Sequence, residues 1–366
     1  SYWLKGPAAA FASWSQVVAR ILEGEELFAA TGDESTLKAA TNVDGGEPYL
    51  PRAKGVAAGL SAAGLRDRAS EHAWKTCPAG TRFVTVAVDV QAGRFVVQVE
   101  AWRDGLDRVL VDRFDLVTPP EGAARAEERA LDPARFPEDW DVLLALATRA
   151  WPVVGEDYAL RPCGVIVDAG GAPGVTPNAY AFYRKARRIA RGLFHLVRGR
   201  GGEKVKRAEA ANPETAHKGK RHVAKDITLV WAGTDRLKGE VAASLTRGEE
   251  GGRALLLPRG APADVFGEYS AERPDANGRW EKKPGVRRNE ALDLSVYALA
   301  LVIVLGAERI QWHRPPHWAR ADASNTFATL SAPEPEGEPE TEPEPEAPPV
   351  KARRRPRRGK TNLTGW

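Results

Sequence analysis

One short run of apolar residues constrains the fold of this chain more than any other stretch. Residues 83–91 read Phe-Val-Thr-Val-Ala-Val-Asp-Val-Gln, six apolar or small residues followed by an acid. The run is rich in β-branched side chains and too short for a typical helix, so it predicts a strand buried on both faces at the centre of a sheet. The carboxylate of Asp89, at the end of that strand, is costly to desolvate without a partner. A divalent cation is one such partner, and exposure to water is the alternative.

The composition allows a large folded domain and indicates a polyanionic partner. The chain has 366 residues, of which 43% are hydrophobic, which suffices for one large domain or two smaller ones. The formal net charge is only +4, but residues 184–225 hold fourteen Lys or Arg against three Glu. Such a one-sided segment favours a polyanion such as double-stranded DNA, and a solvated surface loop is the alternative.

The sequence gives no sign of export, of a membrane span or of zinc. Residues 1–5 lack the apolar core of a signal peptide, and the longest apolar run, 296–305, is too short to cross a bilayer. Cys77 and Cys163 have no second Cys or His at zinc-ligand spacing. We therefore expect a reducing compartment, no secretion and no membrane partner. The chain starts with Ser and contains no Met, so we expect a fragment or a processed product.

Periodicity and turn residues predict three parts: a helical lead-in over 1–79, an α/β domain over 80–311 and a disordered tail over 312–366. The tail prediction rests on the alternation of Pro and Glu in 332–349, a composition that cannot form a core. In the domain, the expected strands are 83–88, 94–102, 108–117, 164–167, 193–197, 227–231 and 254–257, the first three forming an antiparallel meander. Four helices are expected: one opens at Pro137, one is capped by Thr176, one runs over 235–247, and one runs over 290–307 and is capped by Asn289. Residues 198–225 are expected to form a mobile loop.

Three acids stand at the ends of these elements. Asp89 ends the first strand, Asp168 ends the 164–167 strand, and Asp293 lies in the first turn of the closing helix. In a ribonuclease H-like mixed sheet flanked by helices, these two strands are adjacent and parallel and the closing helix crosses them, so the three carboxylates meet. Converging carboxylates repel one another unless a cation lies between them. The pattern predicts a Mg²⁺ or Mn²⁺ site, with two ions about 4 Å apart, suited to phosphodiester hydrolysis.

Each acid also has a simpler interpretation. Asp168 stands before two glycines, where a strand commonly ends, and Asp293 stands where a helix favours acids. Glu290, one turn before Asp293, is either a fourth metal ligand or a helix starter. The combination of three aspartates at matching positions, beside a basic segment, is what favours a catalytic site.

Basic residues form a second candidate surface. In the helix expected after Thr176, arginines recur at offsets 0, 3, 4 and 7, which places them on one face. We expect this stripe and the basic residues that follow it to contact DNA phosphates. The residues are Arg184, Arg187, Arg188, Arg191, Arg198, Arg200, Lys204 and Lys206.

Several motifs occur in an order that resembles a known family. They are Ala-Val-Asp-Val-Gln at 87–91, Val-Asp-Ala-Gly-Gly at 167–171 with Tyr-Ala-Phe at 180–182, Gly-Thr-Asp-Arg-Leu-Lys at 233–238, and Arg-Asn-Glu-Ala-Leu-Asp at 288–293 with Val-Tyr-Ala-Leu-Ala at 296–300. The lead-in adds Phe-Ala-Ser-Trp at 11–14 and the segment 41–48. On these motifs, residues 1–311 resemble the C-terminal nuclease region of the lambda-type (GpA) phage terminase large subunit.

The resemblance implies a metal-dependent endonuclease that cuts concatemeric phage DNA in the host cytoplasm at packaging. It also implies a small terminase subunit, an ATPase motor domain and the portal protein as partners, and it adds Lys238 to the expected DNA contacts. No Gly-x-x-x-x-Gly-Lys-Ser/Thr loop occurs in these 366 residues, so we expect no ATP hydrolysis from this chain alone.

Two rival hypotheses stay open from the sequence. Another ribonuclease H-like enzyme, such as a resolvase or transposase, would share the acids. A non-catalytic DNA-binding or portal-docking component would use the basic residues alone, with the acids only capping helices and strands. The resemblance implies that the tail docks on the portal, and a basic block at 351–360 and the terminal Trp366 follow the Pro/Glu segment. The alternative is that the basic block only balances the charge of the preceding glutamates.

Overall fold

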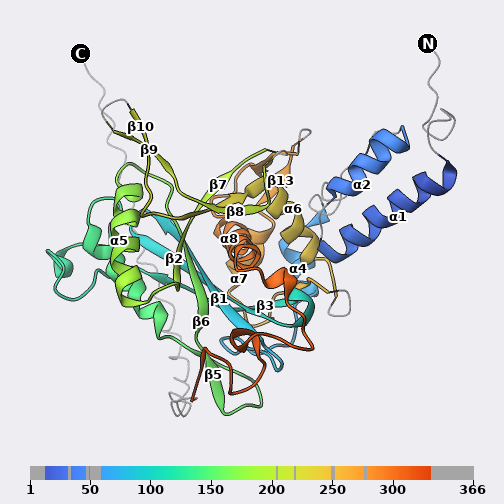
Figure 1. Cartoon of the computed structure of the whole chain (residues 1–366). Coiled ribbons are helices and arrows are strands. Elements are labelled where there is room, and N and C mark those ends of the chain that lie inside the picture. Colours follow the sequence, from blue (N-terminus) through green and yellow to red (C-terminus); the bar gives the residue numbers. More distant parts are fainter. Residues whose placement is uncertain are drawn as a thin grey trace, which may run out of the picture. The chain divides into compact units, whose positions relative to one another are not determined.

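The computed structural model divides by its internal contacts into one unit over residues 1–331 and a second over residues 332–366, and the second lies outside the described residues. Figure 1 shows the chain coloured along its sequence. The structure describes residues 13–31, 34–46, 49, 59–202, 205–217, 220–248, 252–275 and 278–330.

An eight-stranded mixed sheet forms the centre of the first unit, in the order β12-β3-β2-β1-β6-β7-β11-β8. β1 pairs antiparallel with β2 and parallel with β6, and the register joins Val88 to Val167. The residues that follow these two, Asp89 and Asp168, therefore lie beside each other at the carboxyl ends of neighbouring strands. The strands are β1 (Phe83–Gln91), β2 (Arg94–Trp102), β3 (Arg108–Leu116), β6 (Pro162–Asp168), β7 (Phe194–Arg200), β8 (Ala208–Ala211), β11 (Leu229–Gly233) and β12 (Leu255–Leu256).

β1 is buried on both faces, as its composition predicts. Val84, Val86 and Val88 belong to one core cluster, and Phe83 and Ala87 belong to another on the opposite face. Alternate residues of a strand point to opposite faces, so one strand contributes to both cores. An apolar strand end of this kind leaves little water near Asp89.

Helices cover both faces of the sheet (Figure 1). α5 (Val175–Ile189) and the 3₁₀ helix η5 (Pro137–Ala147) cover one face, and α6 (Thr234–Ser244), α7 (Ala263–Tyr269) and α8 (Glu290–Val304) cover the other. α8 is apolar nearly all round and twelve of its residues are buried, which suits a helix laid across β1 and β6. Gly164 permits this close approach, because a Cβ there would lie 2.9 Å from Leu301 Cδ2.

Smaller elements complete the unit. The lead-in holds α1 (Trp14–Thr31), α2 (Ser35–Ala39) and α4 (Ala62–Asp67), which agrees with its predicted helical character. Within the described residues, no helix is both long and apolar enough to cross a membrane. The remaining strands are β4 (Trp151–Pro152), β5 (Tyr158–Leu160), β9 (Glu214–His217), β10 (Lys220–Val223), β13 (Glu272–Pro274), β14 (Trp280–Lys282) and β15 (Ala328–Leu330).

The α/β class and the mixed sheet confirm the predicted fold class and are compatible with a ribonuclease H-like fold, but two local predictions are wrong. Residues 198–225 are not one loop, since they include the end of β7 and contain β8, β9 and β10. Gly174, not Thr176, caps α5, and the Thr176 hydroxyl donates to Ala169 O at 2.8 Å. The helix expected at Pro137 does begin there, as a 3₁₀ helix. Asn289 is the N-cap residue of α8, as predicted, although its side chain makes no capping hydrogen bond.

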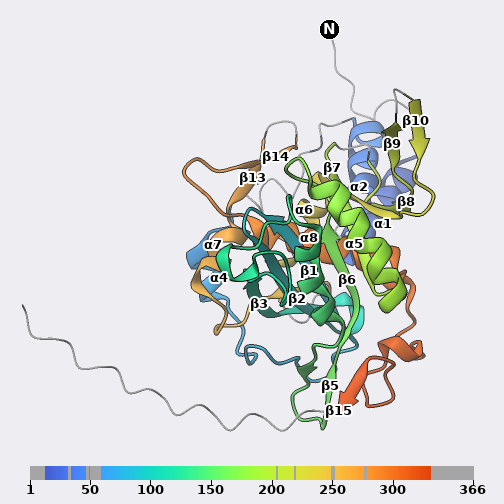
Figure 2. The same cartoon turned by 90° about the vertical axis from the view of Figure 1, so that its left-hand side faces the viewer.

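The expected domain end at residue 311 is also wrong. Residues 312–330 lie on the domain, where Trp318 packs on Phe83 with ring centroids 5.1 Å apart. β15 pairs antiparallel with β5 along the register Ala328 to Leu160 (Figure 2). Trp312, Trp318 and Phe327 of this segment pack against the core, so their apolar surface is partly buried. The predicted disorder of 331–366 lies outside the described residues.

Candidate active site

Three elements place the three predicted aspartates within electrostatic range of one another. Asp89 and Asp168 lie at the ends of β1 and β6, and Asp293 lies in the first turn of α8. The charges of Asp168 and Asp293 both raise the pKa of Asp89, which requires that all three share one region. The topology thus brings together residues that are 79 and 125 positions apart in the printed sequence.

Asp89 is the most perturbed of the three. Its side chain is 8% exposed, and its only hydrogen-bond donor among the described residues is Gln91 Nε2, 2.5 Å from Oδ2. Burial first, and then the charges of Asp168, Asp293 and Glu290, raise the pKa of Asp89 to about 7. Within the residues that the structure describes, Asp89 forms no ion pair.

Asp168 is held by the turn that follows β6. The Gly170 N–H donates to Oδ1 at 2.9 Å, and a Cβ at Gly170 would lie 3.3 Å from the same oxygen. Burial raises the pKa of Asp168, while the Gly170 N–H and the nearby charge of Arg198 act in the opposite direction. Gly170, two residues after Asp168, therefore orients this carboxylate.

Asp293 belongs to a closed set of four side chains that we call the lysine quartet: Lys238, Glu272, Asn289 and Asp293. Lys238 Nζ lies 2.6 Å from Glu272 Oε2 and 2.8 Å from Asp293 Oδ1. Asn289 Nδ2 donates to Asp293 Oδ2 at 2.9 Å and to Glu272 Oε1. Burial raises the pKa of Asp293 and the ammonium of Lys238 opposes that rise.

Glu290 lies beside the aspartates but is paired with arginines. Its side chain is buried, and its two oxygens lie 3.3 Å from Arg94 Nη2 and 3.4 Å from Arg288 Nε. The charge of Glu290 nevertheless contributes to the raised pKa of Asp89. The two predicted roles of Glu290, metal ligand or helix starter, stay predictions. In the structure, its side chain pairs with Arg94 and Arg288.

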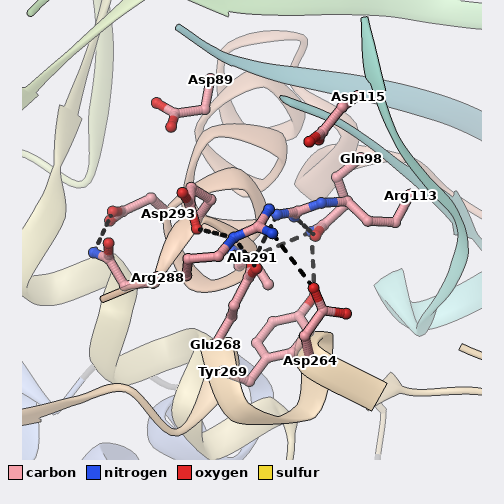
Figure 3. Close-up of polar contacts among 12 residues, drawn as sticks. Asp89, Gln98, Arg113, Asp115, Asp264, Glu268, Tyr269, Arg288, Ala291 and Asp293 are labelled. Atoms are coloured by element: carbon pink, nitrogen blue, oxygen red, sulfur yellow. Dashed lines mark hydrogen bonds and ion pairs between the residues drawn. The ribbon is translucent and has the colours of Figure 1, made fainter. Parts of the chain in front are cut away.

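A polar network beneath α8 fixes the helix that carries Asp293. Glu268 Oε2 accepts the Ala291 N–H at 2.9 Å and lies 2.7 Å from Arg113 Nη2. Gln98 Nε2 donates to Ser295 Oγ at 2.9 Å, and the Arg108–Glu100 ion pair, at 3.0 Å, is fully buried. In Figure 3, Arg113 lies among the dashed contacts, and Asp89 lies apart from them.

The donor set suits a hard divalent cation. It consists of carboxylate oxygens, which Mg²⁺ and Mn²⁺ prefer, and Asp89 and Asp168 have no ion-pair partner within the described part of the chain. Among the described residues, no three His, Cys, Asp or Glu side chains lie close enough together to hold a metal ion. An ion here would be held by the two side chains of Asp89 and Asp168, because Asp293 is paired with Lys238.

The predicted basic surface is only partly free. Arg184 pairs with Asp226 at 2.5 Å, and Arg187 donates to the Asp226 carbonyl at 2.9 Å. Arg188 and Arg191 are exposed without a partner among the described residues. Arg198 Nη2 donates to Thr176 Oγ1 at 2.9 Å beside Asp168, Arg200 stacks 3.7 Å above the Trp231 ring, Lys206 pairs with Glu209 at 2.7 Å, and Lys204 lies outside the described residues.

The sequence did not predict that Glu272 pairs with Lys238 or that Tyr297 lies near the aspartates, and Lys238 was expected to contact DNA. Lys238 is 8% exposed and lies inside the acidic site. Tyr297 lies one helical turn after Asp293, a spacing that places it on the same face, and burial together with Asp168, Asp293 and Asp89 raises its pKa well above the usual value. Glu272 carries no comparable signal, because its strand of three residues has no recognisable pattern.

Comparison with known proteins gives one match. A family model described as terminase large subunit gpA, endonuclease domain, matches residues 1–312. No curated protein and no solved structure matches the chain. The matched segment contains Asp89, Asp168, Asp293 and the lysine quartet.

Proposed function

Because this chain belongs to the family of terminase large subunit gpA endonuclease domains, we propose that it is a metal-dependent endonuclease that cuts double-stranded phage DNA during genome packaging. The observation that supports metal dependence is the adjacent placement of Asp89 and Asp168 at the carboxyl ends of β1 and β6, where Asp89 is buried, Asp168 is partly buried, and neither forms an ion pair among the described residues. Two such carboxylates repel each other and favour a cation between them.

The protein's own residues have distinct tasks in this proposal. Asp89 and Asp168 hold Mg²⁺ or Mn²⁺, Gln91 and the Gly170 N–H orient the two carboxylates, and α8 brings Asp293 and Tyr297 to the same place. The chemistry that a divalent ion supplies at such a site is charge neutralisation on a phosphate oxygen and activation of a water. The low exposure of Asp89 keeps bulk water from screening these charges.

We place the DNA on the side of the site where Arg198 emerges. Arg198 is held by Thr176 and its charge acts on Asp168, so a phosphate bound to Arg198 lies next to the acids. Arg188 on α5 and Arg191 in the turn that follows it extend the basic surface. Binding through such contacts weakens steeply with salt, and reversing the charge of Arg188 and Arg191 should flatten that dependence for all sequences alike.

Plasmid nicking tests the proposal directly. The full chain should nick supercoiled plasmid with Mg²⁺ or Mn²⁺ and stop when EDTA is added. Asp89→Asn and Asp168→Asn keep the side-chain shape but remove a charged ligand, so nicking should fall by about a hundredfold or more. Asp141→Asn is the matched control, because Asp141 forms an ion pair with Lys185 outside the site, at 2.6 Å.

Two results would decide against this function. Full nicking by Asp89→Asn would remove the acids from the chemistry and leave a DNA-binding component of the packaging machinery. Cleavage confined to branched junctions would indicate a resolvase instead.

Docking on the portal through the tail is a separate proposal. The basic block at 351–360 and Trp366 supply charge and an aromatic anchor for a partner surface. A chain truncated after Leu330 keeps Trp318 and β15, so nicking should stay nearly intact while capture by portal rings is lost. Loss of nicking in this truncated chain would place the tail on the DNA-binding surface instead.

A further inference from the structure

We propose that Lys238 supplies a fixed positive charge in place of a second divalent ion, so that this chain binds one ion, at Asp89 and Asp168. The inference rests on the proposed nuclease function and changes its expected cofactor from two ions to one. It also assigns Lys238 as a positioning residue for Asp293.

The position of the lysine ammonium is the first observation. Lys238 extends from α6 and lies between Glu272 of β13 and Asp293 of α8, at 2.6 Å and 2.8 Å from their nearest oxygens. The side chains of Lys238 and Glu272 are only 10% and 4% exposed. A buried ammonium is stable only beside anionic partners, so Glu272 and Asp293 hold Lys238 in this position.

The second observation is that the lysine quartet leaves no carboxylate oxygen without a donor. Each of the two acids gives one oxygen to Lys238 and the other to Asn289 Nδ2. A divalent ion bound to Asp293 and Glu272 would have to displace the ammonium, which is of like charge. The ammonium thus already compensates part of the negative charge of the two carboxylates, and it occupies the position that an ion between them would take.

The third observation is the contrast with the other half of the site. Asp89 and Asp168 accept hydrogen bonds from neutral donors, Gln91 Nε2 and the Gly170 N–H, and form no ion pair within the described residues. The need for a cation is therefore confined to these two aspartates. One ion there and one ammonium beside Asp293 would then supply the positive charge of the site without a second metal.

Counting bound Mn²⁺ tests the inference. Electron paramagnetic resonance of free Mn²⁺ during titration of the full chain gives the number bound, and the nicking rate against Mn²⁺ concentration gives the number required with DNA present. For the unaltered chain we expect one bound ion and a Hill coefficient of about one. Two bound ions, or a Hill coefficient near two, would overturn the inference.

Variants at Lys238 sharpen the result. Lys238→Met removes the charge at similar length and frees the oxygens of Asp293 and Glu272, so a second Mn²⁺ should bind. Lys238→Arg should restore binding of a single ion, and Lys185→Met, which breaks an exposed ion pair with Asp141, should change nothing. A Lys238→Met chain that still binds one ion would overturn the inference.

Asp293→Asn keeps the test decisive if Lys238→Met does not fold. Because Lys238, and not the ion, holds Asp293, this variant should still bind one Mn²⁺ with nearly unchanged affinity. A loss of Mn²⁺ binding of about tenfold or more in Asp293→Asn would mean that Asp293 is a direct ligand. No Mn²⁺ bound by the unaltered chain would instead overturn the proposed function itself.

Discussion

Two groups of buried carboxylates lie beside α8, and their charge is balanced in different ways. Glu100 and Glu268, in the network beneath the helix, pair with Arg108 and Arg113 at 3.0 Å and 2.7 Å. Asp89, at the end of β1, is also buried, but its one hydrogen-bond donor among the described residues is a neutral amide. The first arrangement holds the helix in place, and the second leaves a site that needs a cation, so the presence of a partner separates structural from functional acids here.

The largest effect is expected in the network. Glu268→Ala leaves the guanidinium of Arg113, whose side chain is 5% exposed, without its carboxylate and removes the acceptor of the Ala291 N–H. The free energy of unfolding should fall by about 3–5 kcal/mol in urea titrations. Glu71→Ala, which breaks an exposed ion pair with Arg259, is the control and should hardly change stability. A similar small change in Glu268→Ala would contradict the structural role of this pair.

Lys238 belongs to both groups, since it is paired like the network but lies in the site. Lys238→Met leaves the buried Glu272 and the partly exposed Asp293 without a cation, and the free energy of unfolding should fall by about 3 kcal/mol. Added Mn²⁺ should recover part of this loss in the variant, because the ion replaces the ammonium. The measurement is urea unfolding with and without Mn²⁺, and an unchanged loss in Mn²⁺ would contradict the replacement.

Asp89→Asn should act in the opposite direction on stability. The folded pKa of Asp89 is about 7, above its usual 3.8, so the folded chain holds this proton more tightly and loses stability as the pH rises between these values. Without metal, the variant should therefore be more stable than the unaltered chain by on the order of 2 kcal/mol at pH 8, and the gain should vanish near pH 4. Thermal unfolding at the two pH values measures this difference. A variant that is less stable at pH 8 would show that Asp89 has a structural partner.

The smallest effect is the dependence of nicking on pH. The ion competes with the proton on Asp89, whose pKa of about 7 reflects burial and the charges of Asp168, Asp293 and Glu290. At low Mg²⁺ the rate should fall about tenfold for each pH unit below 7, and saturating Mg²⁺ should move the midpoint to lower pH. Single-turnover nicking from pH 5.5 to 8.5 measures the midpoint. A midpoint that is independent of Mg²⁺ would assign the titration to another group.

The sequence alone determined the elements that carry the site. The apolar run of β1, the second strand over 94–102 and the acid in the first turn of α8 are local patterns, because burial on two faces and helix periodicity are written in neighbouring residues. Asp89, Asp168 and Asp293 could be chosen for the same reason, as each stands at the end of such a pattern.

Tertiary structure decided which of these acids has a cationic partner. Lys238 and Glu272 are separated by 34 positions, and Asp293 lies 21 positions further on, so no local pattern predicts their ion pairs. The pairing depends on how α6, β13 and α8 pack around one point. The packing of the segment 312–330 on the domain likewise depends on the contact of Trp318 with Phe83. The sequence does not reveal this contact, because long-range contacts depend on the whole fold.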